Sequence, residues 1–119
     1  MAALAAYPTL VNGSRRVEPD ELRRWLARTD APLVVDVRRH DEYATGNISG
    51  SRNVPLQVLG KALADLPRDR EIVVHCAGGY RSAIAASLLS ANGFTVADLV
   101  GGFGAWKGAP AAGACTVKR

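Results

Sequence analysis

The feature that most constrains the fold of this chain is the alternation of short apolar runs with stretches of helical periodicity. The clearest runs are rich in β-branched residues and cover Leu33–Val37, Glu71–His75 and Val96–Val100. Strands that alternate with helical stretches are typical of βαβ units, in which successive strands lie parallel. The sequence therefore predicts an α/β protein built on a mostly parallel sheet.

Two shorter runs complete the set of expected strands, an edge strand at Arg15–Val17 and a brief strand at Arg52–Val54. Proline at a first helical position and glycine or asparagine after a last one mark the expected helix ends. The expected helical segments are Pro19–Ala27, Asp41–Ala44, Pro55–Leu66, Arg81–Ala91 and a final turn at Phe103–Trp106.

The length of 119 residues is enough for one domain with a single core. Residues 1–14 are expected to be a lead-in, because they end in the turn signal Asn12-Gly13-Ser14. Residues 15–110 then form the domain, and residues 111–119 form a tail of turn-forming and small residues that we expect to be loosely ordered.

The charge pattern argues against a nucleic-acid partner. Lys and Arg number 15 against 11 Asp and Glu, but the arginines are scattered singly or in pairs, and aromatic residues make up only 6%. A basic stripe with stacking side chains is therefore missing from the sequence. No apolar run has membrane-spanning length, and the N-terminus lacks the basic region of a signal peptide, so no membrane partner is expected.

The two cysteines, Cys76 and Cys115, are too few for a disulfide framework, and no Cys or His pair has the spacing of metal ligands. We therefore expect no metal and no cofactor. A reducing cytoplasm, where a free reactive thiol survives, is the expected location. Cys115 is expected to be an incidental thiol, with resolution of an oxidised Cys76 as the alternative.

Cys76 is the strongest candidate for a reactive residue. It follows the strand Glu71–His75 and opens the segment Cys76-Ala77-Gly78-Gly79-Tyr80-Arg81-Ser82, after which a helical pattern begins. Two glycines let the backbone curl so that successive N–H groups point into one cup, and the helix adds the positive end of its dipole. Such surroundings lower the pKa of a cysteine from about 8.5 to roughly 3.5–7.5. The segment is therefore predicted to be a nucleophile site at the carboxyl end of a parallel strand.

Four stretches in order resemble the rhodanese family. They are an Asp-x-Arg strand end followed by Glu-Tyr and a Gly-His-Ile turn, an Asn-Ile-Pro, the active-site pattern Cys-x-x-Gly-x-Arg, and a closing Gly-Gly-x-x-Ala-Trp. This chain has Asn47 in place of the histidine and Val54 in place of the isoleucine of Asn-Ile-Pro. In this chain these lie at residues 36–48, 53–55, 76–81 and 101–106, and the similarity covers about residues 15–110. The loop after Cys76 also resembles those of rhodanese modules fused to persulfide dioxygenases.

The resemblance implies a rhodanese-like fold, with a central five-stranded sheet flanked by helices on both faces. It also implies a single-domain sulfurtransferase of sulfur metabolism. Such an enzyme moves a sulfane sulfur from thiosulfate or a low-molecular-weight persulfide, such as glutathione persulfide, to cyanide or a thiol through a cysteine persulfide. The expected partners are therefore a small anionic donor and a thiophilic acceptor. A separate persulfide dioxygenase or another sulfur-trafficking protein is a further candidate partner.

The resemblance assigns Cys76 as the catalytic nucleophile. It assigns substrate binding to the loop residues Ala77, Gly78, Gly79, Tyr80, Arg81 and Ser82, whose N–H groups would stabilise an anionic persulfide. Two roles stay open for Arg81, binding the anionic end of the donor or bracing the loop. Ser82 would either donate a hydrogen bond to the thiolate or cap the helix.

Three charged residues are expected to support the site rather than to react. Asp36 and Arg38 are predicted to form a structural salt bridge or turn bond, with Glu42 as a further partner. His75 lies next to Cys76, but strand alternation points its side chain to the opposite face, so we expect a structural histidine.

Two other classes of function compete with a small-molecule sulfurtransferase. One is a protein-fed sulfur carrier or a non-catalytic interaction module on the same fold. The other, less favoured, is a cysteine-dependent phosphatase. Four residues separate Cys76 from Arg81, one fewer than in the Cys-x5-Arg loop of those enzymes, which favours a cup for a single sulfur atom.

Overall fold

The structure, a computed structural model, describes residues 15–108 of the chain. Five strands form one sheet in the order β1-β5-β4-β2-β3, and each neighbouring pair is parallel. The strands are β1 (Arg15–Val17), β2 (Leu33–Asp36), β3 (Arg52–Asn53), β4 (Ile72–His75) and β5 (Val96–Leu99). The predicted α/β class with a five-stranded parallel sheet is confirmed.

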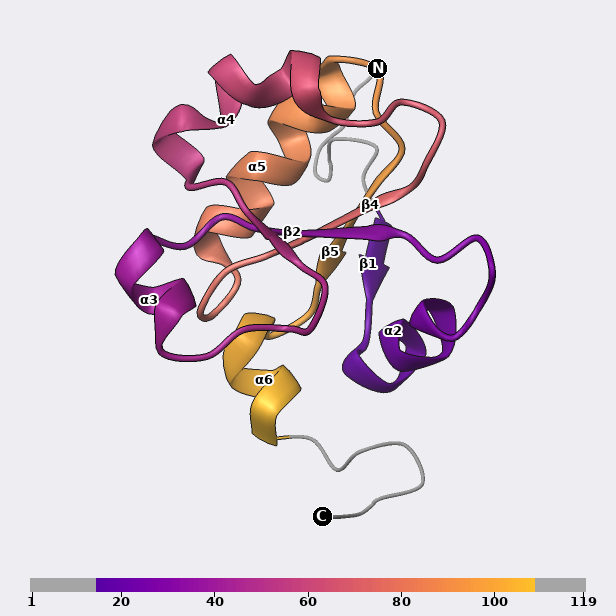
Figure 1. Ribbon diagram of the computed structural model, residues 1–119, viewed down its shortest axis with the longest axis vertical. Helices are drawn as coiled ribbons and strands as arrows, with labels where there is room; N and C mark the ends of the chain where they lie inside the picture. Colours follow the sequence, from indigo (N-terminus) through magenta and orange to yellow (C-terminus); the bar gives the residue numbers. More distant parts are fainter. Residues whose placement is uncertain (1–14, 109–119) are drawn as a thin grey trace, which may run out of the picture.

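Helices cover both faces of this sheet. They are α2 (Pro19–Leu26), α3 (His40–Ala44), α4 (Leu56–Ala62), the 3-10 turn η2 (Leu63–Asp65), α5 (Tyr80–Ala91) and α6 (Gly102–Gly108). Figure 1 shows α4 and α5 side by side over one face, with α2 and α6 over the other. Among residues 15–108, no helix is long and apolar enough to cross a membrane.

The central strands are buried along their whole length because both of their faces are covered. Successive side chains point to opposite faces and enter two separate cores. On the α5 face, Val35 and Val74 pack with Leu89. On the α2 face, Val73 packs with Leu22. The continuous apolar runs of the sequence are thus strands with two buried sides.

The order of the strands fixes where a ligand can bind. The chain moves outward from β2 to β3 and then returns across the sheet to β4, so the direction of winding reverses between β2 and β4. Open α/β sheets bind ligands beyond the carboxyl ends of the strands at such a switch point. The segments that leave these ends are the Cys76 loop after β4 and α3 after β2.

Two helices differ from their predicted extents by more than one residue at an end. The helix expected to run from Pro55 to Leu66 is α-helical only to Ala62 and then tightens into η2. Leu66 is extended, at φ −96° and ψ 141°, because the proline that follows it disfavours the helical conformation. The final turn is a longer helix, α6, which begins at Gly102. Residues 1–14 and 109–119, which include the expected lead-in, tail and Cys115, lie outside the described residues.

Candidate active site

Cys76 begins the loop that leaves the carboxyl end of β4. Its side chain is only 1% exposed and packs in the same core as Val74, on the α5 face. The preceding residue, His75, stacks against Phe103 of α6 on the other face, with ring centroids 6.2 Å apart. Strand alternation therefore separates the imidazole from the thiol, and His75 is not a base for Cys76.

The loop after Cys76 folds back over the sulfur and directs backbone N–H groups at it. The N–H of Gly79 lies 3.1 Å from Sγ, and the N–H of Ser82 lies 3.3 Å from it. Gly79 adopts φ +117°, which L side chains rarely adopt, so the curl depends on glycine at this position. The Ser82 hydroxyl oxygen also approaches Sγ, at 3.6 Å. These groups form an anion-binding cup around one sulfur atom.

The cup changes the acidity of the thiol. Burial alone raises the pKa of Cys76, because it disfavours the charged thiolate. Hydrogen bonds from the Ser82 hydroxyl and from the N–H groups of Ser82, Gly79 and Gly78 outweigh burial, so the pKa lies below the ordinary value for cysteine. A thiolate is the reactive form of cysteine, and this site favours it.

Arg81 is held by a residue from a different element. Its two terminal nitrogens donate to the carboxylate oxygens of Glu42 on α3, at 2.7 and 3.0 Å. The hydrogen bond from Arg81 lowers the pKa of Glu42 to about 2. The pair therefore ties the first turn of α5 to α3 across the switch point of the sheet. This geometry matches the bracing role that the sequence left open for Arg81.

The outer side of the loop faces solvent. Ala77, Gly78 and Tyr80 are exposed, Gly79 and Arg81 are half-buried, and Ser82 is fully buried. Of the six loop residues expected to bind substrate, the structure thus brings the backbone of Gly79 and Ser82 against the sulfur. Tyr80 itself is 81% exposed.

The start of α6 holds the other side of the loop. The N–H of Phe103 donates to the carbonyl oxygen of Cys76 at 2.7 Å, and the N–H of Gly104 donates to that of Ala77 at 3.1 Å. Because a trans peptide points its N–H opposite to its C=O, both bonds turn the next N–H groups, those of Ala77 and Gly78, away from α6. The N–H of Gly78 is one of the groups that lower the pKa of the thiol. A Cβ at Gly102 would collide with the Cys76 carbonyl oxygen, so this close approach requires glycine.

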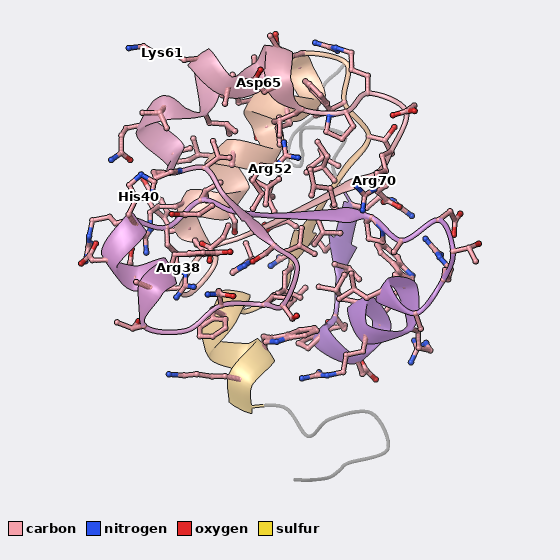
Figure 2. The ribbon with its side chains drawn as sticks, in the orientation of Figure 1. Arg38, His40, Arg52, Lys61, Asp65 and Arg70 are labelled. Atoms are coloured by element: carbon pink, nitrogen blue, oxygen red, sulfur yellow. The ribbon has the colours of Figure 1, made fainter. Side chains whose placement is uncertain are left out.

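Asp36 and Arg38 form a buried ion pair at the end of β2. The guanidinium binds both carboxylate oxygens, with contacts from 2.7 to 3.1 Å, and also donates to the carbonyl of Gly46. Arg38 lies just above α6 in Figure 2, and its guanidinium stacks 4.4 Å from the centroid of the Phe103 ring. Glu42, which the sequence placed with this pair, bonds to Arg81 instead.

His75 lies against the same ion pair. Its Nε2 is 3.5 Å from an oxygen of Asp36. Burial lowers the pKa of His75 and outweighs the attraction of the Asp36 charge, so the imidazole stays neutral near pH 7.

Sequence reasoning missed two features of the site. One is Asp98 on β5, which is 6% exposed on the α5 face and close to Ser82. A carboxylate inside the otherwise apolar run Val96–Val100 was the available signal. The other is the clamp from α6, whose only trace in the sequence is the pair Gly101-Gly102. Among residues 15–108, no cluster of His, Cys, Asp or Glu has the arrangement of a metal site.

Comparison with known proteins places this geometry in a family. The sequence model of the rhodanese-like domain family matches residues 18–109 of this chain. A sulfurtransferase from Allochromatium vinosum is 33% identical over 91 residues, which cover 76% of this chain and 85% of that protein. The thiosulfate sulfurtransferase GlpE of Ectopseudomonas mendocina is 33% identical over 94 residues, with 78% and 84% covered.

A solved structure has the same fold. The crystal structure of a rhodanese-like domain protein from Staphylococcus aureus matches with a TM-score of 0.74 and 32% identity, covering 77% of this chain and 90% of that one. The residues matched by the family model, 18–109, include β2 to β5, the cysteine loop and the start of α6. The chain belongs to the rhodanese-like domain family.

Proposed function

We propose that this protein is a sulfurtransferase that carries a sulfane sulfur as a persulfide on Cys76. The observation that carries the proposal is the pair of N–H groups, from Gly79 and Ser82, that lie within 3.3 Å of a buried sulfur. Donors fixed in this way stabilise a thiolate before the reaction and a persulfide anion after it. The sulfurtransferase relatives support the same class of reaction.

The proposed reaction has two halves, as in covalent catalysis by an activated nucleophile. The Cys76 thiolate attacks the outer sulfur of thiosulfate, an S–S bond forms on Cys76, and sulfite leaves with the electron pair of the broken bond. A low-molecular-weight persulfide such as glutathione persulfide would react in the same way and release its thiol. Cyanide or a thiol then attacks the outer sulfur and regenerates the Cys76 thiolate.

The loop accounts for recognition of small donors. Ala77 and Gly78 are exposed and carry little or no side chain, so a donor can approach the sulfur from solvent over them. Arg81 contributes by holding the loop against Glu42, with its positive charge close enough to Cys76 to interact with it. The donor's anionic end would meet N–H groups and this field rather than a free guanidinium.

A protein-fed sulfur carrier is the second candidate, and one observation favours it. Tyr80 is 81% exposed and Ile84, one helical turn later, is 45% exposed, so apolar surface lies beside the loop. A protein thiol or persulfide, presented by a separate persulfide dioxygenase or another sulfur-trafficking protein in the cytoplasm, would fit this surface. The loop of four residues between Cys76 and Arg81 disfavours a phosphatase, because the cup closes on one atom.

Intact-protein mass spectrometry tests the proposal. The protein is incubated with thiosulfate or with glutathione persulfide, then with cyanide, beside Cys76→Ser and Cys115→Ser variants. We expect one added sulfur atom on wild type and on Cys115→Ser but not on Cys76→Ser, and its release by cyanide as thiocyanate. An adduct that survives in Cys76→Ser would refute the assigned nucleophile. No adduct from either small donor would favour the protein-fed carrier.

A further inference from the structure

A buried carboxyl group lies behind the active-site cysteine and takes no part in the reaction described above. Asp98 sits on β5, where its neighbours in the sheet are Arg16 on β1 and Val74 on β4. It is only 6% exposed, and its Oδ1 is buried without a hydrogen-bond partner among the described residues. A buried acceptor left open in this way is uncommon and calls for an explanation.

Ser82 connects this carboxyl group to the sulfur. Its hydroxyl oxygen lies 3.6 Å from Cys76 Sγ and 3.2 Å from the carbonyl oxygen of Gly79. The same hydroxyl is close enough to Asp98 to act on the titration of its carboxyl group. The Ser82 hydroxyl donates to the Gly79 carbonyl, so it must rotate out of this bond before it can donate to the carboxylate of Asp98.

We propose that Asp98 accepts the proton of the Cys76 thiol through the Ser82 hydroxyl, so that the buried pair shares one proton. The Cys76 S–H bond breaks and its electron pair stays on sulfur. Ser82 Oγ takes this proton while its own O–H proton forms a bond to a carboxylate oxygen of Asp98. Asp98 is then a positioning residue for the proton, and it touches no substrate.

Electrostatics supports a shared proton. Burial raises the pKa of Asp98, while the Ser82 hydroxyl and the charge of Arg16 only partly oppose this. The pKa of Cys76 is lowered, so the difference between the pKa values of the two groups is smaller than for a free cysteine and a free aspartate. Two negative charges in one buried site are costly, so transfer within the pair keeps a single charge there. The charge of Arg16 acts on Asp98, and that of Arg81 interacts with Cys76.

The pH profile of Cys76 alkylation by iodoacetamide tests this inference. The inference rests on the proposed function only in that both use the Cys76 thiolate. The alkylation measurement itself needs no sulfur donor. Cys76 and Cys115 fall on separate tryptic peptides, residues 71–81 and 108–118, so each rate is read by mass spectrometry. In wild type, we expect the alkylation rate of Cys76 to fall with pH in two steps separated by a plateau. On the plateau the pair holds one proton, and a fixed fraction of molecules carries the thiolate with Asp98 protonated.

Asp98→Asn keeps the shape of the side chain but cannot hold the proton. We expect a single step, below which the alkylation rate falls about tenfold for each pH unit, with no plateau. Ser82→Ala leaves both titrating groups in place, so it should keep the plateau, with the steps moved to higher pH because the hydroxyl no longer lowers the pKa of either group. The matched controls are Ser90→Ala on the same helix and Asp65→Asn on the exposed turn η2, and both should keep the plateau. Figure 2 labels Asp65 at the α4 side of the molecule.

The outcomes separate this inference from the proposed function. A plateau in wild type that Asp98→Asn loses and Ser82→Ala keeps supports the shared proton even if no persulfide forms. Profiles of the same shape in wild type and Asp98→Asn would overturn it, even if sulfur transfer is normal. Infrared difference spectra of wild type against Cys76→Ser give a second measurement should Asp98→Asn fail to fold. The relay requires a protonated-carboxyl band near neutral pH that weakens in Cys76→Ser, and an equal band in both proteins would contradict it.

Discussion

Arg81 and Glu42 form a two-point ion pair, with nitrogen–oxygen distances of 2.7 and 3.0 Å, that joins the active-site loop to α3. Both terminal nitrogens of the guanidinium are used in this pair, which is the geometry that binds a carboxylate most firmly. The charge nearest to the loop is therefore engaged within the protein before any donor arrives.

Removing either partner of this pair should loosen the loop. We expect Arg81→Ala and Glu42→Gln each to lower kcat/KM by about tenfold, with similar losses for thiosulfate and for a neutral organic trisulfide. The double variant should be little worse than either single one, because all three lack the same brace. If Arg81→Ala impairs only the anionic donor and Glu42→Gln impairs neither, Arg81 binds the donor instead.

The same pair should make stability depend on acid pH. The pKa of Glu42 is lowered from 4.5 to about 2 by Arg81, so the folded protein binds its proton less readily than the unfolded chain. The stabilisation is therefore present above about pH 4.5 and is lost as the pH falls toward 2. In urea unfolding, the difference between wild type and Glu42→Gln should shrink across this range. A difference that does not change with pH would exclude this linkage.

Cys76→Ser should abolish sulfur transfer without unfolding the domain. Serine is close in size to cysteine but is a far weaker nucleophile, so turnover should fall by at least about three orders of magnitude. Circular dichroism and the urea midpoint check that the fold persists. Turnover near the wild-type level would show that another group carries the sulfur.

Gly102→Ala should disturb the cup through the backbone. The added Cβ would collide with the Cys76 carbonyl oxygen, and φ at this position is +60°, so we expect a loss of about 1–3 kcal/mol of stability together with slower transfer. Gly60→Ala is the matched control, because a Cβ at that helical position meets open space. We expect this variant to gain as much as about 1 kcal/mol in the free energy of unfolding. Equal stabilities of the two variants would contradict the clamp.

Asp36→Ala should cost stability rather than chemistry. It would leave Arg38, which is 4% exposed, as a buried charge without its carboxylate, a change worth about 3–5 kcal/mol in the free energy of unfolding. Urea unfolding measures the loss, and Asp65→Ala on the exposed turn η2 should cost little. A loss below about 1 kcal/mol would mean that water or another group replaces the pairing.

Local features of the sequence were sufficient for the fold class and for the place of Cys76 at the junction of a strand and a loop. The runs at Leu33–Val37, Glu71–His75 and Val96–Val100 each became a buried strand within one residue of its expected ends. Apolar periodicity and glycine spacing depend only on neighbours in the chain, so they can be interpreted before any contact is known. The error at the end of α4 was also local, because the Pro67 after Leu66 was available as a signal.

The sequence by itself determined the strands, the helices and the loop that carries Cys76, because these follow from short-range patterns of apolar residues, glycine and proline. Only the tertiary structure decided which partners those residues meet. Glu42 lies 39 positions from Arg81, and it reaches the loop because β2 and β4 are neighbours at the switch point. Asp98 reaches Ser82, and Phe103 reaches the carbonyl of Cys76, because β5 lies beside β4. Strand order sets such meetings, and it is a property of the whole chain.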